Sequence, residues 1–205
     1  QDCGGSVRAL ERGVEIAQKL VEDASKVERE PMELGDLLLG TNCGGSDATS
    51  GLAANPVIGV VSDKVVAAGG TVMLGETTEL IGTEDILASR AATPEVADDI
   101  YTIVHGLEQS FVEAGVDVRG ANPSPGNMKG GLSTLEEKAL GGISKGGTTP
   151  ITQVVPYGVR PTESGLTIMD TPGYDIESVS GMTCGGAQVL IFSTGRGTPI
   201  GNPLI

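Results

Sequence analysis

The chain has 205 residues, a formal net charge of −14 at pH 7, 2% aromatic residues and no Trp, so it suits one or two domains with an aliphatic core. The negative charge argues against nucleic acid and anionic membranes as partners, because both are bound by concentrated Lys and Arg. No apolar run approaches the roughly 18 residues of a membrane-spanning helix, so no membrane segment is expected.

The first predicted element is an amphipathic helix with an N-cap at Ser6 and a stop at Pro31. A buried strand over residues 36–40 follows, and then a turn and a helix that close at Gly69-Gly70. The stretch TVMLGE is a second strand, and it ends on Glu76. The first helix is indicated by apolar residues at steps of three and four, which are Val7, Leu10, Val14, Ala17, Val21 and Ala24.

The second half of the chain continues this alternation. Residues 115–131 are a predicted loop, because they are rich in Gly, Pro and Asn. The other predicted elements are helices over residues 83–90, 94–114, 132–141 and 176–186, and strands in ITQVVPY, GLTIMD and AQVLIFSTG. Strands that alternate with helices predict an α/β fold with a mostly parallel sheet, here as a single domain over residues 1–205.

Polar, glycine-rich stretches follow four of the predicted strands. In a parallel sheet, ligands bind beyond the carboxyl ends of the strands. We therefore expect these stretches to lie near one edge of the sheet, which the sequence places at residues 43–47, 76–79, 170–175 and 194–197.

Each of the three cysteines, Cys3, Cys43 and Cys184, is followed by two glycines. Their wide spacing, their odd number and the absence of an opening signal segment favour a reducing, cytoplasmic setting. Cys43 lies between a predicted strand and helix, and a helix N-terminus favours the thiolate that binds metal or attacks carbon. Three thiolates could hold an iron–sulfur cluster, or the cysteines could mark three unrelated turns.

Charged residues near the strand ends offer further candidates. Glu76 and Asp170 can bind a hard divalent metal, act as a general base, or cap the next helix. Lys129 stands among Asn and Gly in a cationic stretch, residues 122–150, where it can bind an oxyanion or belong to a solvated loop. We expect Lys138 at the surface. Arg196 adds a guanidinium suited to a carboxylate.

The single His105 lies mid-helix, which removes a Ser-His-Asp triad and any His-rich metal site from consideration. No GxGxxG or GxxxxGK[ST] motif opens a helix, so nucleotide binding has little support.

Several long motifs resemble those of the galactarate dehydratase/altronate dehydratase family, which includes the large subunit of sulfolactate sulfo-lyase. They are NCGGSDATSGLAANP, NPSPGNMKGGLSTLEEKALGGISKGGTTPI, MDTPGYD and STGRGTP. The resemblance covers about residues 1–205 and implies the C-terminal domain of a longer sugar-acid lyase with a Rossmann-like parallel sheet and helices on both faces. It also implies Fe²⁺ as cofactor, with an iron–sulfur cluster or another divalent metal as alternatives.

The resemblance implies a reaction as well. A metal held by Cys43 and Glu76, with Cys3 and Cys184 as further candidates, would chelate the substrate carboxylate and 2-hydroxyl. Lys129 or Glu76 would take the C2 proton, and the 3-substituent would leave as water, or as sulfite in the sulfo-lyase branch. Substrate-binding candidates are Gly44, Gly45, Ser46, Asp47, Asn127, Thr148, Thr149, Asp170, Thr194 and Arg196.

The expected partners are a small acidic substrate, either a sugar acid or sulfolactate, and an N-terminal domain or small subunit. A second copy in a homodimer is a further expectation. The rival interpretation is a non-catalytic binding or assembly domain.

Overall fold

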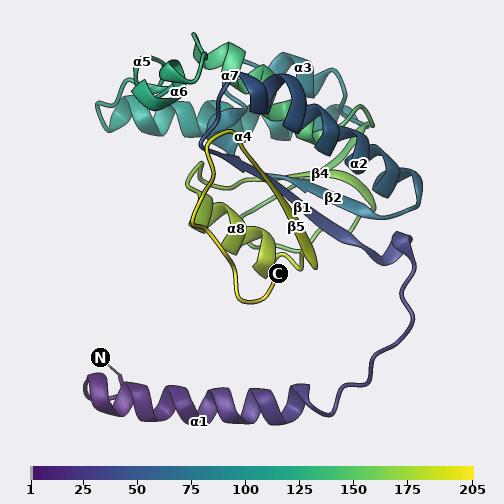
Figure 1. Ribbon diagram of the computed structural model, residues 1–205, viewed down its shortest axis with the longest axis vertical. Helices are drawn as coiled ribbons and strands as arrows, with labels where there is room; N and C mark the ends of the chain where they lie inside the picture. The colour runs from purple at the N-terminus through teal and green to yellow at the C-terminus, as the bar shows by residue number, and fades with distance from the viewer. Residues whose placement is uncertain (1) are drawn as a thin grey trace. The chain divides into compact units, whose positions relative to one another are not determined.

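The computed structural model describes residues 2–205 and divides them into two compact units, one that ends at Met32 and one over Glu33–Ile205 (Figure 1). The single domain expected over residues 1–205 stays a prediction. None of the helices in residues 2–205 combines the length and apolar character that crossing a bilayer requires.

The first unit holds α1 (Ser6–Ala24), which confirms the predicted amphipathic helix. Its N-cap is Gly5, whose φ of 120° suits glycine, so the prediction of Ser6 as N-cap is wrong by one residue. None of the residues of α1 is buried.

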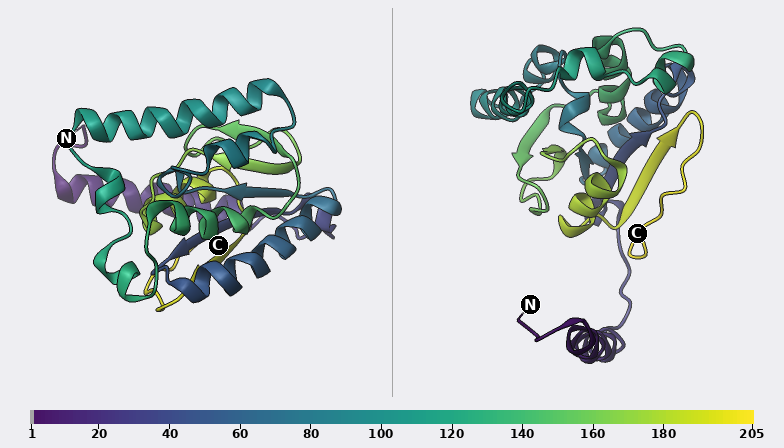
Figure 2. Two further views of the ribbon diagram at one scale, coloured as in Figure 1. Left: turned by 90° about the horizontal axis from the view of Figure 1, so that it is seen from above. Right: turned by 90° about the vertical axis from the view of Figure 1, so that its left-hand side faces the viewer.

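The second unit is built on a parallel sheet with the strand order β3-β4-β2-β1-β5 (Figure 2). Every pairing between neighbouring strands is parallel, so the expected α/β fold is confirmed. The bounds of the strands are β1 Leu38–Gly44, β2 Thr71–Leu74, β3 Ile151–Val155, β4 Gly165–Met169 and β5 Val189–Thr194.

Helices cover both faces of the sheet (Figure 1). On one face lie α2, α3, α4 and α7, and on the other lies α8. Their bounds are α2 Asn55–Ala67, α3 Glu84–Ala88, α4 Pro94–Glu113, α5 Val118–Ala121, α6 Pro125–Lys129, α7 Leu135–Ile143 and α8 Asp175–Cys184. Short helical turns complete the unit, namely η1 Leu34–Asp36, η2 Ser50–Ala54, η3 Thr77–Glu79 and η4 Ser144–Gly146.

Two short helices, α5 and α6, lie in the stretch predicted as a loop. Both begin at a side-chain cap, because Asp117 accepts from the Gly120 N–H and Ser124 accepts from the Asn127 N–H. Ser followed by Pro is a helix-start signal, since Pro at the first helical position already has a helical φ. The Gly and Pro content of this stretch concealed that signal.

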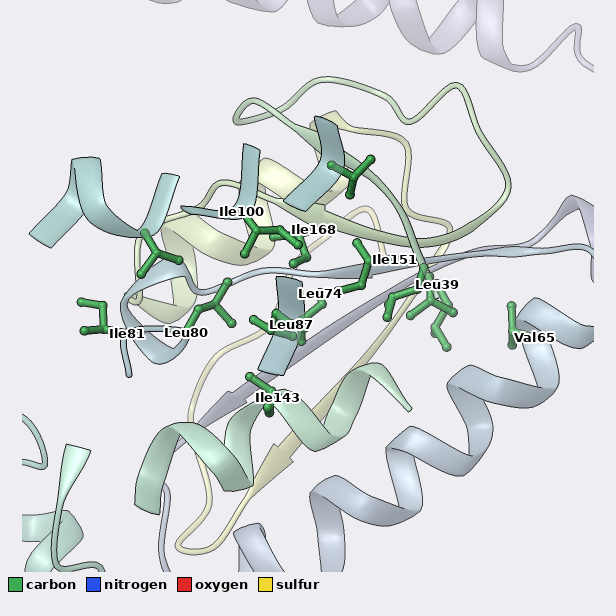
Figure 3. Close-up of a cluster of buried hydrophobic side chains, with 14 of the residues drawn as sticks. Leu39, Val65, Leu74, Leu80, Ile81, Leu87, Ile100, Ile143, Ile151 and Ile168 are labelled. Carbon is green, nitrogen blue, oxygen red and sulfur yellow. The ribbon is translucent and has the colours of Figure 1, made fainter. Parts of the chain in front are cut away.

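The core between the sheet and the larger helical layer is purely aliphatic, as composition predicted. Leu39 and Leu74 from the sheet meet Ile100 of α4 and Ile143 of α7 there (Figure 3). A smaller cluster around Met73 and Met182 lies beneath α8. The two clusters hold the sheet between its helices and so fix the position of the strand ends.

Close packing between α2 and η4 depends on Gly59. A Cβ atom at this position would overlap the carbonyl oxygen of Ser144. The hydroxyl of Ser62, one turn further along α2, donates to the carbonyl oxygen of Lys145 at 2.7 Å. The helix therefore holds the backbone of Lys145 directly against the sheet.

We predict that Gly59→Ala lowers the free energy of unfolding by about 1–3 kcal/mol, because α2 and η4 must separate to admit the methyl group. The matched control is Gly106→Ala in α4, where an added Cβ meets nothing within 4 Å. That change should stabilise the protein by about 0.5–1 kcal/mol through helix propensity. Urea denaturation of both variants tests the packing, and equal effects at the two positions would contradict it.

Candidate functional site at the carboxyl edge of the sheet

The four polar stretches meet at the carboxyl edge of the sheet, as predicted. The Cys43 N–H donates to Glu76 Oε2 at 2.9 Å, and the Thr77 hydroxyl donates to Asp170 Oδ1 at 2.7 Å. A Cβ at residue 44 would lie 2.7 Å from the Asp175 carboxylate, so β1 and the start of α8 approach closely there. A Cβ at residue 45 would lie 3.1 Å from the Thr194 hydroxyl.

A buried lysine, Lys145, lies at the centre of this edge. Its Nζ is 2.8 Å from Cys43 Sγ and 3.0 Å from Glu76 Oε2. Lys145 and Glu76 are each 1% exposed and Cys43 is 5% exposed. Three elements supply these side chains, because Cys43 lies in β1, Glu76 follows β2 and Lys145 lies in η4. We refer to them as the Cys43–Glu76–Lys145 cluster.

Glu76 adopts a backbone conformation that side chains seldom tolerate. Its φ of 66° is the only positive φ of a non-glycine residue within residues 2–205. Such a conformation costs of order 1–3 kcal/mol and persists only where the surroundings enforce it. Here the Glu76 N–H donates to the Thr171 hydroxyl at 2.6 Å, while its carboxylate accepts from the Cys43 N–H. The turn therefore aims the carboxylate at Cys43 and Lys145.

Burial determines the protonation of Cys43. Burial, with a further contribution from the negative charge of Glu76, raises the pKa of the thiol to about 11 against the opposing effect of Lys145. The expectation of a thiolate at a helix start is wrong, because Cys43 lies inside β1 and away from water. At neutral pH Cys43 is a neutral thiol.

The two charged members of the cluster balance each other. Burial raises the pKa of Glu76, and the Lys145 ammonium opposes this. Burial lowers the pKa of Lys145, but Glu76 and a Cys43 thiolate raise it, and the net pKa lies above its ordinary value. Because Cys43 is a neutral thiol at neutral pH, Glu76, whose Oε2 lies 3.0 Å from Lys145 Nζ, is the partner that opposes the effect of burial there.

Three chain segments predicted to bind substrate come together beside this cluster. The Asn127 amide donates to the Ser46 carbonyl oxygen at 2.8 Å. The Asp47 carboxylate packs so closely on residue 195 that any Cβ there would overlap it. A Cβ at residue 126 would lie 2.7 Å from the Arg196 guanidinium. Both Arg196 and Lys129 are exposed, so this side of the edge presents two cations to solvent.

Other candidates lie elsewhere. Thr148 donates to Asp63 of α2 at 3.0 Å, and Thr149 accepts from Arg90 through its carbonyl oxygen at 2.9 Å. Both threonines precede β3 and so lie at the amino end of a strand. Cys184 also lies near the amino ends, because the chain just beyond it bonds to the start of β1 through the Gln188 N–H. Cys43 and Cys184 therefore do not share a site. Cys3 is exposed and belongs to the first unit.

Lys138 is not a surface residue, in contrast to the expectation. Its side chain is 12% exposed, and its Nζ lies 2.8 Å from Glu79 Oε1 and 2.8 Å from Asn122 Oδ1. The position is explained by α7, whose inner face turns Lys138 toward η3. Lys138 and Lys145 are thus the site residues that sequence reasoning missed. The available signal was only their place in the cationic stretch over residues 122–150, because Lys138 lies in α7 and Lys145 in the separate turn η4.

The side chains of the second unit do not fit a metal bound by Cys43 and Glu76. The Lys145 ammonium already lies within hydrogen-bond distance of both groups. Within residues 2–205, no three His, Cys, Asp or Glu side chains are placed to hold a metal ion. The iron cofactor stays a prediction.

A family model described as D-galactarate/Altronate dehydratase, C-terminal, matches residues 34–205. The chain belongs to this family. It is 42% identical over 192 residues to altronate dehydratase of Bacillus subtilis (strain 168), a match that covers 94% of this chain and 38% of that protein. The family resemblance of the motifs is therefore confirmed.

Two other relatives carry different names. The chain is 40% identical over 188 residues to galactarate dehydratase (L-threo-forming) of Escherichia coli (strain K12), covering 92% of this chain and 36% of that protein. It is 37% identical over 196 residues to (2R)-sulfolactate sulfo-lyase subunit beta of Chromohalobacter salexigens, covering 92% of this chain and 49% of that protein. The chain spans half or less of the length of each of these relatives.

We predict that Cys43 resists alkylation in the native protein. With a pKa of about 11, only about one thousandth of the thiol is thiolate at pH 8, the form that iodoacetamide attacks. The exposed Cys3 and Cys184 should react first, and the Cys43 rate should rise with pH toward 11. Peptide mass spectrometry measures the alkylation rate of each cysteine, and the urea-unfolded chain serves as the control. Equal native rates at pH 8 would show that Cys43 is an accessible, activated thiol.

Proposed function

We propose that this chain is the C-terminal part of a lyase that dehydrates a sugar acid, such as altronate or galactarate, to a 2-keto-3-deoxy acid. Its relatives' names support this proposal, and the meeting of the polar stretches around the Cys43–Glu76–Lys145 cluster at the carboxyl edge of the sheet is the observation that carries it. Parallel α/β sheets bind their ligands at this edge. A further domain or subunit would complete the site, since the relatives are longer.

The residues at this edge take different parts in the proposed reaction. Lys129 is exposed on α6 beside Asn127, so it can reach a bound substrate as the C2 base or as an anion anchor. Glu76 is buried behind Cys43 and Lys145, so it acts through them by orienting the edge. Loss of the C2 proton and of the 3-hydroxyl as water leaves an enol, which tautomerises to the keto acid.

The second candidate is the elimination of sulfite from sulfolactate. The match to the sulfo-lyase subunit, 37% identical over 196 residues, supports it. A subunit of that kind would need a partner. A non-catalytic binding or assembly domain remains the alternative from another class.

Turnover by the full-length protein with ferrous iron distinguishes these proposals. Altronate or galactarate should yield a 2-keto acid, whereas sulfolactate should yield sulfite together with its keto product. A protein that converts none of the three would contradict both lyase proposals and favour the binding domain.

Within the active protein, we predict that Lys129→Ala impairs turnover. Loss of a base should lower kcat by about 10²–10⁴-fold, and loss of an anchor used equally in the ground and transition states should mainly raise KM. The matched control is Lys64→Ala, because Lys64 is an exposed lysine near the far end of α2. Kinetic constants that stay unchanged in Lys129→Ala would make this lysine a solvated loop charge.

A further inference from the structure

Two lysine–glutamate pairs lie side by side at the carboxyl edge, at different depths. Lys145 and Glu76 are sealed, each with 1% of the side chain exposed. In the Lys138–Glu79 pair, the side chains are 12% and 11% exposed. The second pair is therefore less deeply buried than the first, yet it is shielded enough for its charges to act strongly.

Lys138 has capacity for one more acceptor. An ammonium group carries three donors, and Lys138 Nζ uses two of them on Glu79 Oε1 and Asn122 Oδ1. Lys138 also lines a cavity of about 10 Å³ together with Cys43, Asp47 and Asn55. That volume is about what one water, or one carboxylate oxygen, requires. A donor with spare capacity thus lines a space for a single oxygen atom.

Lys138 lies among several carboxylates at this edge. Burial raises the pKa of Asp175, Glu177 and Glu79 raise it further, and Lys138 opposes them. Glu79 also raises the pKa of Glu76. Carboxylates outnumber lysines here, which works against a further anion, and Lys145 is already committed to Cys43 and Glu76. Lys138 is therefore the one of these two lysines that is left for an acidic ligand, which must compete with the neighbouring carboxylates.

We propose that Lys138 is a binding point for the carboxylate of a small hydroxy acid, and that Glu79 competes with this ligand for the same ammonium group. The identity of the acid rests on the proposed function, and the carboxylate site itself does not. Glu79 holds Lys138 in place in the free protein. An incoming carboxylate takes over the ammonium and is repelled by Glu79 while it does so.

The competition gives the two side chains opposite effects. Lys138→Met removes the anchor, and because a hydrogen bond to a charged group contributes about 1.5–3 kcal/mol, KM and Kd should rise about 10- to 100-fold. Glu79→Gln keeps the shape but removes the competing charge, so KM and Kd should fall. A purely structural ion pair predicts weaker binding in both variants.

The experiment uses the full-length protein and two readouts. One is KM for whichever acid is turned over, and the other is Kd for gluconate, a hydroxy-acid probe, by calorimetry. The matched controls are Lys64→Met and Glu163→Gln, because both residues are exposed and lie outside this edge. Lys138→Arg keeps the charge and should recover most of the affinity, which guards against misfolding of Lys138→Met.

Opposite shifts in the two variants support the proposal, and equal or absent shifts overturn it. Turnover in the wild type with no response to either variant would refute the carboxylate site and leave the lyase proposal intact. Gluconate binding that depends on Lys138, without turnover of any acid, would support the carboxylate site and refute the lyase proposal. An absence of both gluconate binding and turnover would overturn both proposals.

Discussion

The ion pair between Lys145 and Glu76 is the interaction on which the carboxyl edge depends. Both side chains are 1% exposed, and each buried ion loses several kcal/mol of hydration that only a well-placed partner restores. The surrounding structure serves this placement. Gly59 and Ser62 hold the backbone of Lys145, and Thr171 holds Glu76 in its left-handed turn. Cys43 is then fixed by both charged groups at the end of β1.

In the proposed site, this arrangement separates structure from ligand contact. The Lys145–Glu76 pair and the Cys43 thiol form a buried floor at this edge. Three further cations lie at this edge, of which Lys138 is 12% exposed and Lys129 and Arg196 are exposed. An acidic chain can bind an acidic ligand in this way, because local cations at a strand edge oppose the overall charge.

Much of this could be predicted from the sequence. Alternating strands and helices predicted the parallel sheet, and polar stretches after four strands predicted the shared edge. The burial of Lys145 could not be predicted, because a lysine between glycine pairs is typical of a solvated loop. Its burial is stabilised by Glu76, which is distant in the sequence and adjacent in the fold. The prediction that Lys138 lies at the surface failed for the same reason, because only the fold brings its partners Glu79 and Asn122 next to it.

The placement of Thr148 and Thr149 shows another limit. Their hydroxyls suit an oxyanion site, but they stand just before β3, and strand direction takes them to the opposite end of the sheet. Composition indicates which chemistry a segment can offer. Only the start of the next strand determines which edge receives it.

A double-mutant cycle on Lys145 and Glu76 tests the central claim most directly, with the free energy of unfolding as readout. Lys145→Met and Glu76→Gln should each cost about 3–5 kcal/mol, because each leaves a buried group without its partner. The double variant should lose much less than the sum, with a coupling above about 1 kcal/mol. Additive losses, within about 0.5 kcal/mol, would show that the two groups do not stabilise each other and would contradict the account.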